Sequence, residues 1–268
     1  MPKRKPVSVS QKQLRAMFED ESQYARVEAA KRAGRLTDKK SLGQLKAAVF
    51  DMHRSVRLFA SRALTRRIGF RATVEFILKR YPGTTLSRTP LEYFLQQGHF
   101  YTIPAKRAHG IGDQILATSP YIRERYGKPV FFHRGFPVVS EESQKDNAQY
   151  RHGVIAMGLG KKGVPEQYRR VVAEHEYGEI WGHEMGLAFE LLYLKKKGLL
   201  EEFLKEYPAH ALQIWEKVVR KNKDFADFAP FFAKIAERYP GGVRQYYKEM
   251  DERDWARTLR RIEKQRQK

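Results

Sequence analysis

The chain has 268 residues, 41% of them hydrophobic, so it can bury a substantial core in one large domain or in two modest ones. Lys and Arg number 52 against 31 Asp and Glu, and the formal charge of +21 goes beyond what solubility needs and favours a polyanionic partner, usually nucleic acid. The absence of cysteine excludes disulfides, a thiol nucleophile and finger-type zinc sites, so any metal site must use His and carboxylate ligands.

The amino-terminal stretch MPKRKPVSVSQKQLRAMF is basic but lacks the apolar core of a signal peptide. No stretch approaches the roughly 18 apolar residues of a membrane span. We therefore expect a cytoplasmic protein with no membrane partner. The abundance of charged residues and the lack of cysteine also fit a thermophilic source.

Residues 1–100 are predicted to form a basic helical region. Val56 and Leu64 mark one apolar helix face, and the apolar pattern continues to Leu78. The sequence Tyr-Pro-Gly at 81–83 is predicted to stop the helix, because Pro disfavours helix in the residue before it.

Arginines fill much of the surface opposite this apolar face. Residues 1–80 hold 20 Lys and Arg and 7 Asp and Glu, so much of the excess positive charge is concentrated there. We expect non-specific contacts with a nucleic-acid backbone, since no helix-turn-helix, zinc-finger or RNA-recognition motif is present. The alternative is a solvated face, or pairing of Arg with Glu between helices. The residues predicted to contact phosphates are Arg54, Arg62, Arg66 and Arg67.

From about residue 101 to residue 165 the sequence changes to short apolar runs separated by Gly and Pro, which is typical of strands. A turn is predicted at Gly135-Phe136-Pro137. The polar run at 140–151 has no apolar periodicity and is predicted to be a loop. The predicted strands of this small sheet are Val130–Phe132, Val138–Val139 and Val154–Met157.

A helix predicted to begin at Val164-Pro165-Glu166 and to reach about residue 194 carries His and carboxylates at the spacing of a metal site. The motif, H-E-x-x-E-x-x-G-H, begins at His175. His175 and Glu179 lie one turn apart on one helix face, as two metal ligands on one helix must. Glu176 adjoins this pair and would face a bound water molecule.

A strand, a short polar connection and a helix with H-E-x-x-E together resemble the core of zincin metallopeptidases, over about residues 150–190. They also resemble the small zincin-like modules of phages and mobile elements. In zincins a helix with H-E-x-x-H packs beneath a sheet, the His residues bind zinc, and the Glu activates the metal-bound water. Carried over by position, the resemblance implies that His175 and Glu179 are metal ligands and that Glu176 is the general base. Because Glu179 replaces a His, the charge and the preferred metal change, and the cofactor is expected to be Zn²⁺ or another divalent ion.

Gly182 adds a second likeness. In the metzincin branch of the family a Gly seven residues after the first His turns the chain, so that a third His reaches the metal. Gly182 has this offset, although His183 follows it at once, where that family has its His three residues later. On an uninterrupted helix His175 and His183 would be about 12 Å apart along the axis, so His183 is predicted to be a ligand only if the helix bends at Gly182. The other candidates for the third ligand are Glu190, His152 and His133.

Two other interpretations of the motif stay open. His175 and Glu179 could form an ordinary pair on the helix surface, which stabilises a helix by about 0.2–0.5 kcal/mol without any metal. A di-iron bundle needs Glu three residues before His on each of two helices. Glu179 and His183 are four residues apart and no second copy of the pattern exists, so the di-iron interpretation ranks lower.

Beyond Gly198 the pattern is helical again, with predicted stops at Tyr207-Pro208 and Tyr239-Pro240-Gly241. The predicted helices cover about 199–206, 209–222, 225–238 and 242–264.

The sequence thus predicts an α+β fold that is predominantly helical, with a small central sheet packed on the motif helix. Its expected regions are a basic helical part (1–100), the sheet with the motif helix (101–198) and a helical part (199–268), which could also form one compact domain. The leading function is a zincin-like, metal-dependent hydrolase acting on peptides, with ligands at His175, Glu179 and, if the helix bends, His183. The alternative is a basic nucleic-acid-binding protein or a nuclease of a virus or mobile element.

Overall fold

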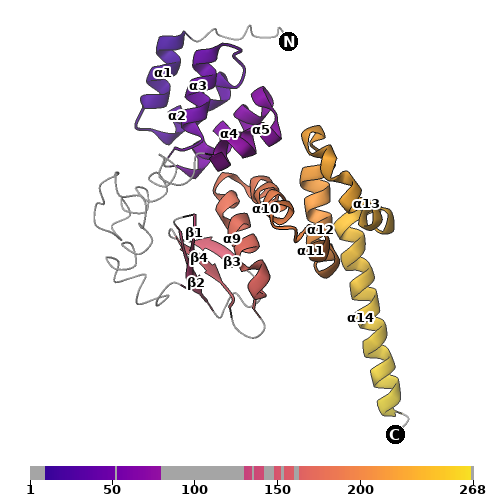
Figure 1. Ribbon diagram of the computed structural model, residues 1–268. Helices are drawn as coiled ribbons and strands as arrows, with labels where there is room; N and C mark the ends of the chain where they lie inside the picture. Colours follow the sequence, from indigo (N-terminus) through magenta and orange to yellow (C-terminus); the bar gives the residue numbers. More distant parts are fainter. Residues whose placement is uncertain are drawn as a thin grey trace. The chain divides into compact units, whose positions relative to one another are not determined.

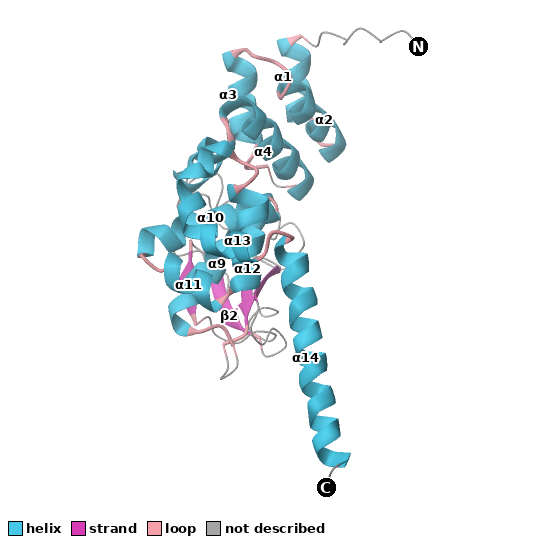
Figure 2. Ribbon diagram, turned by 90° about the vertical axis from the view of Figure 1, so that its right-hand side faces the viewer, coloured by secondary structure: helices cyan, strands magenta, loops and turns pink. Residues whose placement is uncertain are grey.

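The computed structural model describes residues 10–51, 53–79, 130–134, 136–141, 148–151, 154–159 and 163–266. Helices dominate, and one small sheet accompanies them (Figure 2), which confirms a predominantly helical α+β fold. The chain divides into two compact units, residues 1–190 and 191–268. The three regions expected from the sequence stay a prediction, since the expected boundary near residue 100 lies outside the described residues.

Five helices form the amino-terminal part of the first unit (Figure 1). The side chain of Ser10 accepts a hydrogen bond from Gln13 N, and the Gln13 side chain accepts one from Ser10 N, so the first helix begins with a capping box. The helices are α1 (Gln11–Glu19), α2 (Gln23–Ala33), α3 (Lys39–Ala48), α4 (Arg54–Ile68) and α5 (Phe70–Lys79).

Helix α4 is the centre of this group, because α2, α3 and α5 all pack against it. Its side chains Val56, Ala60 and Leu64 are fully buried, as the apolar pattern predicts. The pattern does not form one continuous helix, however. Gly69 has φ of 90°, a conformation that ends α4 and lets α5 begin at Phe70. The predicted stop at 81–83 lies outside the described residues.

Some of the excess arginine is structural. The guanidinium of Arg26 is buried and donates to both carboxylate oxygens of Asp51, at 2.8 and 3.3 Å. It also donates to the carbonyl oxygens of Asp20 and Glu21. This cation therefore fixes the start of α2 to the turn before α4, and its guanidinium is not available to bind a partner.

The sheet has four strands in the order β1-β2-β4-β3, with β2 and β4 parallel and the outer pairs antiparallel. Val138 on β2 and Ile155 and Ala156 on β4 are fully buried, as expected of central strands. The sheet confirms the strands predicted from apolar runs. Its strands are β1 (Phe131–His133), β2 (Phe136–Ser140), β3 (Ala148–Arg151) and β4 (Val154–Met157).

Two local predictions for this sheet were wrong. Residues 148–151, assigned to a polar loop, form strand β3, because antiparallel pairing with β4 supplies their backbone partners despite the missing apolar pattern. The turn lies between His133 and Phe136, with Arg134 at φ of 47°, one residue earlier than expected. Phe136 and Pro137 therefore belong to β2.

Helix α9 (Arg169–Gly178) follows a 3-10 turn, η4 (Glu166–Tyr168), and packs against the sheet. The rings of Tyr177 and Phe136 lie 5.7 Å apart. The buried carboxylate of Glu174 pairs with His133 and accepts two bonds from Arg134, at 2.7 and 2.8 Å, and these contacts lower the pKa of Glu174 although burial alone would raise it. A charged contact thus fixes the motif helix to the β1–β2 hairpin.

The remaining helices follow the predicted order. Tyr207 and Tyr239 each precede a proline and have nearly the same backbone angles, φ of −123° and −125°, which end a helix at both positions. Two predicted helices contain tighter or wider segments, η6 (a π-helix, Trp215–Val219) and η7 (3-10, Lys223–Phe228). The α-helices are α10 (His183–Lys197), α11 (Leu200–Glu206), α12 (Pro208–Ile214), α13 (Ala229–Arg238) and α14 (Gly242–Arg266). Among the helices of the described residues, none combines the length and hydropathy needed to span a bilayer.

Candidate metal centre

The predicted motif helix is interrupted in the middle of the motif. Helix α9 ends at Gly178, a 3-10 turn η5 covers Glu179–Trp181, and α10 begins at His183. Between them Gly182 has φ of 121° and ψ of 155°, a combination that residues with a Cβ rarely adopt. The bend that His183 requires therefore exists, and it lies at the predicted residue.

Packing against α4 and the turn before it holds this bend in place. The indole N–H of Trp181, which is 1% exposed, donates to the carbonyl oxygen of Val49. The buried guanidinium of Arg57 donates to the carbonyl oxygens of Ile180 and Asp51, at 3.4 and 2.8 Å. Contacts with another part of the unit thus fix the chain at Ile180 and Trp181, directly before the bend.

Two glycines let the helices on either side of the bend touch by their backbones. A Cβ on Gly178 would lie 2.6 Å from Gly186 Cα, and a Cβ on Gly186 would lie 2.8 Å from the carbonyl oxygen of His175. Any larger residue at either position would push α9 and α10 apart. The close approach brings Glu190, one turn beyond Gly186, to the ring of His175.

The structure brings all three predicted ligands together. Glu179 Oε1 lies 3.3 Å from His175 Nε2 and 2.7 Å from His183 Nδ1, and the two imidazole centroids are 5.3 Å apart. One ligand atom from each of His175, Glu179 and His183 lies within 4.8 Å of the others. These three residues, called the metal cluster below, could hold a metal ion.

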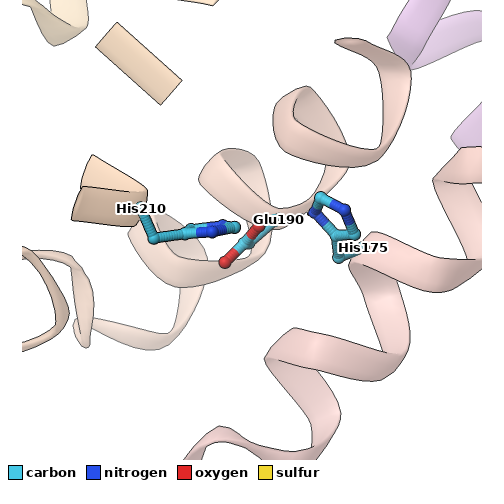
Figure 3. Close-up of side chains that lie close together, drawn as sticks. All are labelled: His175, Glu190 and His210. Carbon is cyan, nitrogen blue, oxygen red and sulfur yellow. Dashed lines mark hydrogen bonds and ion pairs between the residues drawn. The ribbon is translucent and has the colours of Figure 1, made fainter. Parts of the chain in front are cut away.

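Glu190 contacts the other nitrogen of His175. Its carboxylate, which is 1% exposed, lies 2.8 Å from His175 Nδ1, and Figure 3 shows the two side chains facing each other from α10 and α9. Because Nδ1 is occupied, Nε2 is the nitrogen directed at the metal cluster. His210, also drawn there, belongs to α12 of the second unit.

The other candidates for a third ligand have different positions. His133 pairs with Glu174 beside the sheet, and its ring is not among the ligand atoms of the metal cluster. His152 lies outside the described residues.

The charges at the metal cluster are those of a site that attracts cations. Burial alone would lower the pKa of His175, but its bonds to Glu179 and Glu190 and the charges of Glu190 and Glu176 raise that pKa to about 10. Bonds from His175 and His183 hold the pKa of Glu179 well below its ordinary value, although burial opposes the shift. Glu179 is therefore a carboxylate at neutral pH, as a metal ligand must be.

Glu176, the predicted general base, is 6% exposed and contributes its negative charge to the surroundings of His175. Its carboxylate is not among the ligand atoms of the metal cluster. With Glu179 and Glu190 it makes three carboxylates around one buried imidazole, an excess of negative charge that a divalent cation would balance.

The donor set suits zinc. Two imidazole nitrogens and one carboxylate oxygen are a ligand set of catalytic zinc sites, which keep a fourth position open for water or substrate. The side chain of His175 is 10% exposed, while those of Glu179 and His183 are 33% and 40% exposed. One side of the metal cluster is therefore buried and the other is accessible from solvent.

The four arginines predicted to contact nucleic acid have two different environments. Arg54, Arg62 and Arg66 are exposed. Arg67 is half-buried and donates to the carbonyl oxygen of Asp38 and to Ser41 Oγ, at 3.0 and 2.8 Å, so it holds the start of α3 to α4. Arg67 has a structural role that the sequence pattern did not indicate.

Comparison of the chain with protein-family models, curated proteins and solved structures finds no match. The likeness to zincins therefore rests on the motif residues alone, and the function has to be inferred from the geometry of the metal cluster.

The roles of Gly178, Gly186 and Arg57 were not inferred from the sequence. The glycines do have a recognisable signal, since Gly178, Gly182 and Gly186 are spaced by four, which places small residues on one side of a helical stretch. Arg57 has no such signal. It is one of several arginines of α4, and only the tertiary structure shows that this one is buried.

Replacing Gly182 with Ala is expected to lower the free energy of unfolding by about 1–3 kcal/mol, because Ala must adopt φ near 121°. The added Cβ would also meet Leu58 Cδ1 at 3.0 Å. Displacement of His183 should also weaken binding of a divalent metal ion. Thermal unfolding and calorimetric titration with zinc would measure the two effects. Gly43→Ala is the control, since a Cβ there meets nothing within 4 Å and should stabilise α3 by about 0.5–1 kcal/mol. Unchanged zinc affinity in Gly182→Ala would show that the bend does not position a metal ligand.

Proposed function

We propose that this protein is a zinc-dependent hydrolase that cleaves peptides, with the ion held by His175, Glu179 and His183. The observation that supports the proposal is the bend at Gly182, which turns a motif spread over nine residues into one compact set of ligand atoms. An ordinary helix-surface pair would need neither the bend nor His183.

When bound, zinc would supply a Lewis acid that polarises a carbonyl group and makes water a stronger nucleophile. Each protein residue has a distinct task. Glu190 holds His175 Nδ1 and so fixes the tautomer and orientation of the imidazole. Glu179 supplies the anionic ligand, while the exposed edge of His183 borders the side from which a substrate arrives.

Glu176 is proposed to take up the proton of the attacking water and to deliver it to the leaving amine. Its position next to His175 matches that of the general base in the H-E-x-x-H motif. Its near-complete burial keeps the carboxylate out of bulk water, which strengthens its interaction with any charge that develops nearby.

Different effects are expected for two glutamates that each follow a proposed histidine ligand. Glu176→Gln should keep zinc but reduce peptide hydrolysis by about 10²–10⁴-fold, since only the base is removed. Glu184→Gln is the matched control, because Glu184 is exposed and adjoins the other histidine, and it should retain both zinc and activity. Both variants would be assayed on a mixed peptide library by mass spectrometry, with zinc content measured on the same samples.

The same assay would include single-stranded and duplex nucleic acid. Cleavage of nucleic acid without cleavage of peptides would replace the peptidase proposal with a nuclease. A zinc-loaded protein that cleaves neither substrate would contradict the proposed hydrolase.

A further inference from the structure

A second feature of the first unit is independent of the metal cluster. Nine Lys and Arg residues occur in segments 31–47 and 59–67, which contain one acidic residue, Asp38. Contacts within the protein account for four of the nine. Lys31 and Arg32 pair with Glu28, Lys46 lies over the ring of Phe76, and Arg67 binds Asp38 and Ser41.

The other five cations are exposed, and no carboxylate of the described residues pairs with them. They come from the turn between α2 and α3, from the first turn of α3 and from the carboxyl-terminal half of α4. They are Arg35, Lys39, Lys40, Arg62 and Arg66, together called the basic surface.

Tertiary contacts gather these residues from separate segments. Arg66 Nη2 lies 3.3 Å from where a Cβ on Gly34 would be, so the Arg66 guanidinium covers the end of α2 beside Arg35. The bond from Arg67 to the carbonyl oxygen of Asp38 holds the first turn of α3, and therefore Lys39, against the end of α4. Arg62 lies one turn before Arg66, about 6 Å along the axis.

The basic surface does not stabilise the fold. Lys39 and Lys40 occupy the first turn of α3, where positive charge opposes the helix dipole. The carboxylate of Asp38 accepts bonds from Ser41, which lower its pKa and leave it as the cap of α3. Five cations that repel one another and lack carboxylate partners are better explained by an external anion than by stability.

We propose that the basic surface binds the phosphate backbone of double-stranded nucleic acid without sequence preference. An extended polyanion fits cations spread over two helices and a turn better than a single phosphate does. A lipid surface fits less well, because membrane-binding faces expose large apolar side chains. Among the described residues of α1 to α4, Tyr24 is the only large hydrophobic side chain that is mostly exposed, and it lies near the opposite end of α2 from Arg35.

Arg54 is excluded from the basic surface. It is exposed, but it starts α4 and lies about 18 Å along the axis from Arg66. With Arg67 engaged inside the unit, two of the four arginines predicted from the sequence remain, and three cations from the turn after α2 and the first turn of α3 join them.

The test replaces all five residues of the basic surface with Gln and measures binding of a labelled duplex by fluorescence anisotropy. If all five contact phosphates, they contribute about 4 to 5 to the slope of log affinity against log salt, or roughly 500-fold between 50 and 200 mM. The variant should lose that part of the slope. Because the five side chains are exposed and repel one another, the variant should unfold at a temperature no lower than that of the wild type.

Two controls separate a local surface from the overall charge. A charge-matched variant, with Lys196, Lys205, Arg220, Lys223 and Arg244 changed to Gln, removes five exposed cations from the second unit and should keep the binding and the slope. Arg35→Lys, Arg62→Lys and Arg66→Lys combined should also keep binding, since each phosphate contact needs only the charge. Equal losses in the two Gln variants, binding that survives the change of the basic surface, or binding to anionic vesicles in place of duplex would each overturn the proposal.

Discussion

His175→Ala is expected to abolish stoichiometric zinc binding. The wild-type protein, purified without an affinity tag, should carry about one zinc ion per chain by elemental analysis. His175 supplies a nitrogen directed into the metal cluster and is itself fixed by Glu190, so its loss removes a ligand and frees a buried carboxylate. We expect the affinity to fall by more than about 100-fold, beyond the effect of losing an outer partner.

Variants with smaller expected effects would show whether the loss of zinc is specific to the metal cluster. Glu190→Gln keeps all three ligands and removes only the carboxylate behind His175, so it should weaken zinc binding by about 10–100-fold. His53→Ala, at the start of α4, should leave zinc content unchanged. Wild-type protein that stays metal-free and takes up neither zinc nor manganese would instead support the helix-surface pair of His175 and Glu179.

Zinc affinity is expected to rise by about tenfold per pH unit between pH 6 and pH 8, because zinc must displace a proton from His175. The surrounding carboxylates raise the pKa of His175 to about 10, so this imidazole is protonated throughout that range in the metal-free protein. Calorimetric titration in buffers of different ionisation enthalpy should show at least one proton released per zinc bound. An affinity independent of pH would mean that His175 is not a ligand.

The same residue gives the metal-free protein the opposite dependence on pH. The pKa of His175 is higher in the folded chain than its ordinary value of about 6.5, so its contribution to stability is complete below that pH. The contribution is lost as pH rises toward 10. Thermal unfolding in the presence of a chelator should therefore show falling stability over this window, and His175→Gln should remove that part of the slope.

Local signals predicted helix ends in the carboxyl-terminal part of the chain. The Tyr-Pro pairs at 207 and 239 ended helices where expected, because proline restricts the residue before it whatever the tertiary structure. Strand β3 was missed for the opposite reason. Its polar sequence has no apolar periodicity, and it becomes a strand through pairing with β4, which no local pattern reveals.

The candidate site was predictable only in part. His175, Glu179 and Gly182 are close in sequence, so their spacing could indicate both the ligands and the bend. The role of Glu190 could not be predicted, because its distance from His175 depends on how closely two helices cross at Gly186. Arg57 is buried and Arg67 is hydrogen-bonded inside the unit, whereas other arginines of α4 are exposed. One sequence cannot distinguish the two kinds, because neighbouring helices decide which side chains are buried.

A crystal structure of zinc-loaded protein, with anomalous differences measured on both sides of the zinc absorption edge, would test the central claim most directly. One anomalous peak is expected in the first unit, bonded to His175 Nε2, a carboxylate oxygen of Glu179 and His183 Nδ1 at about 2.0–2.2 Å. A peak bound by other residues, or no peak in protein shown to contain zinc, would contradict it.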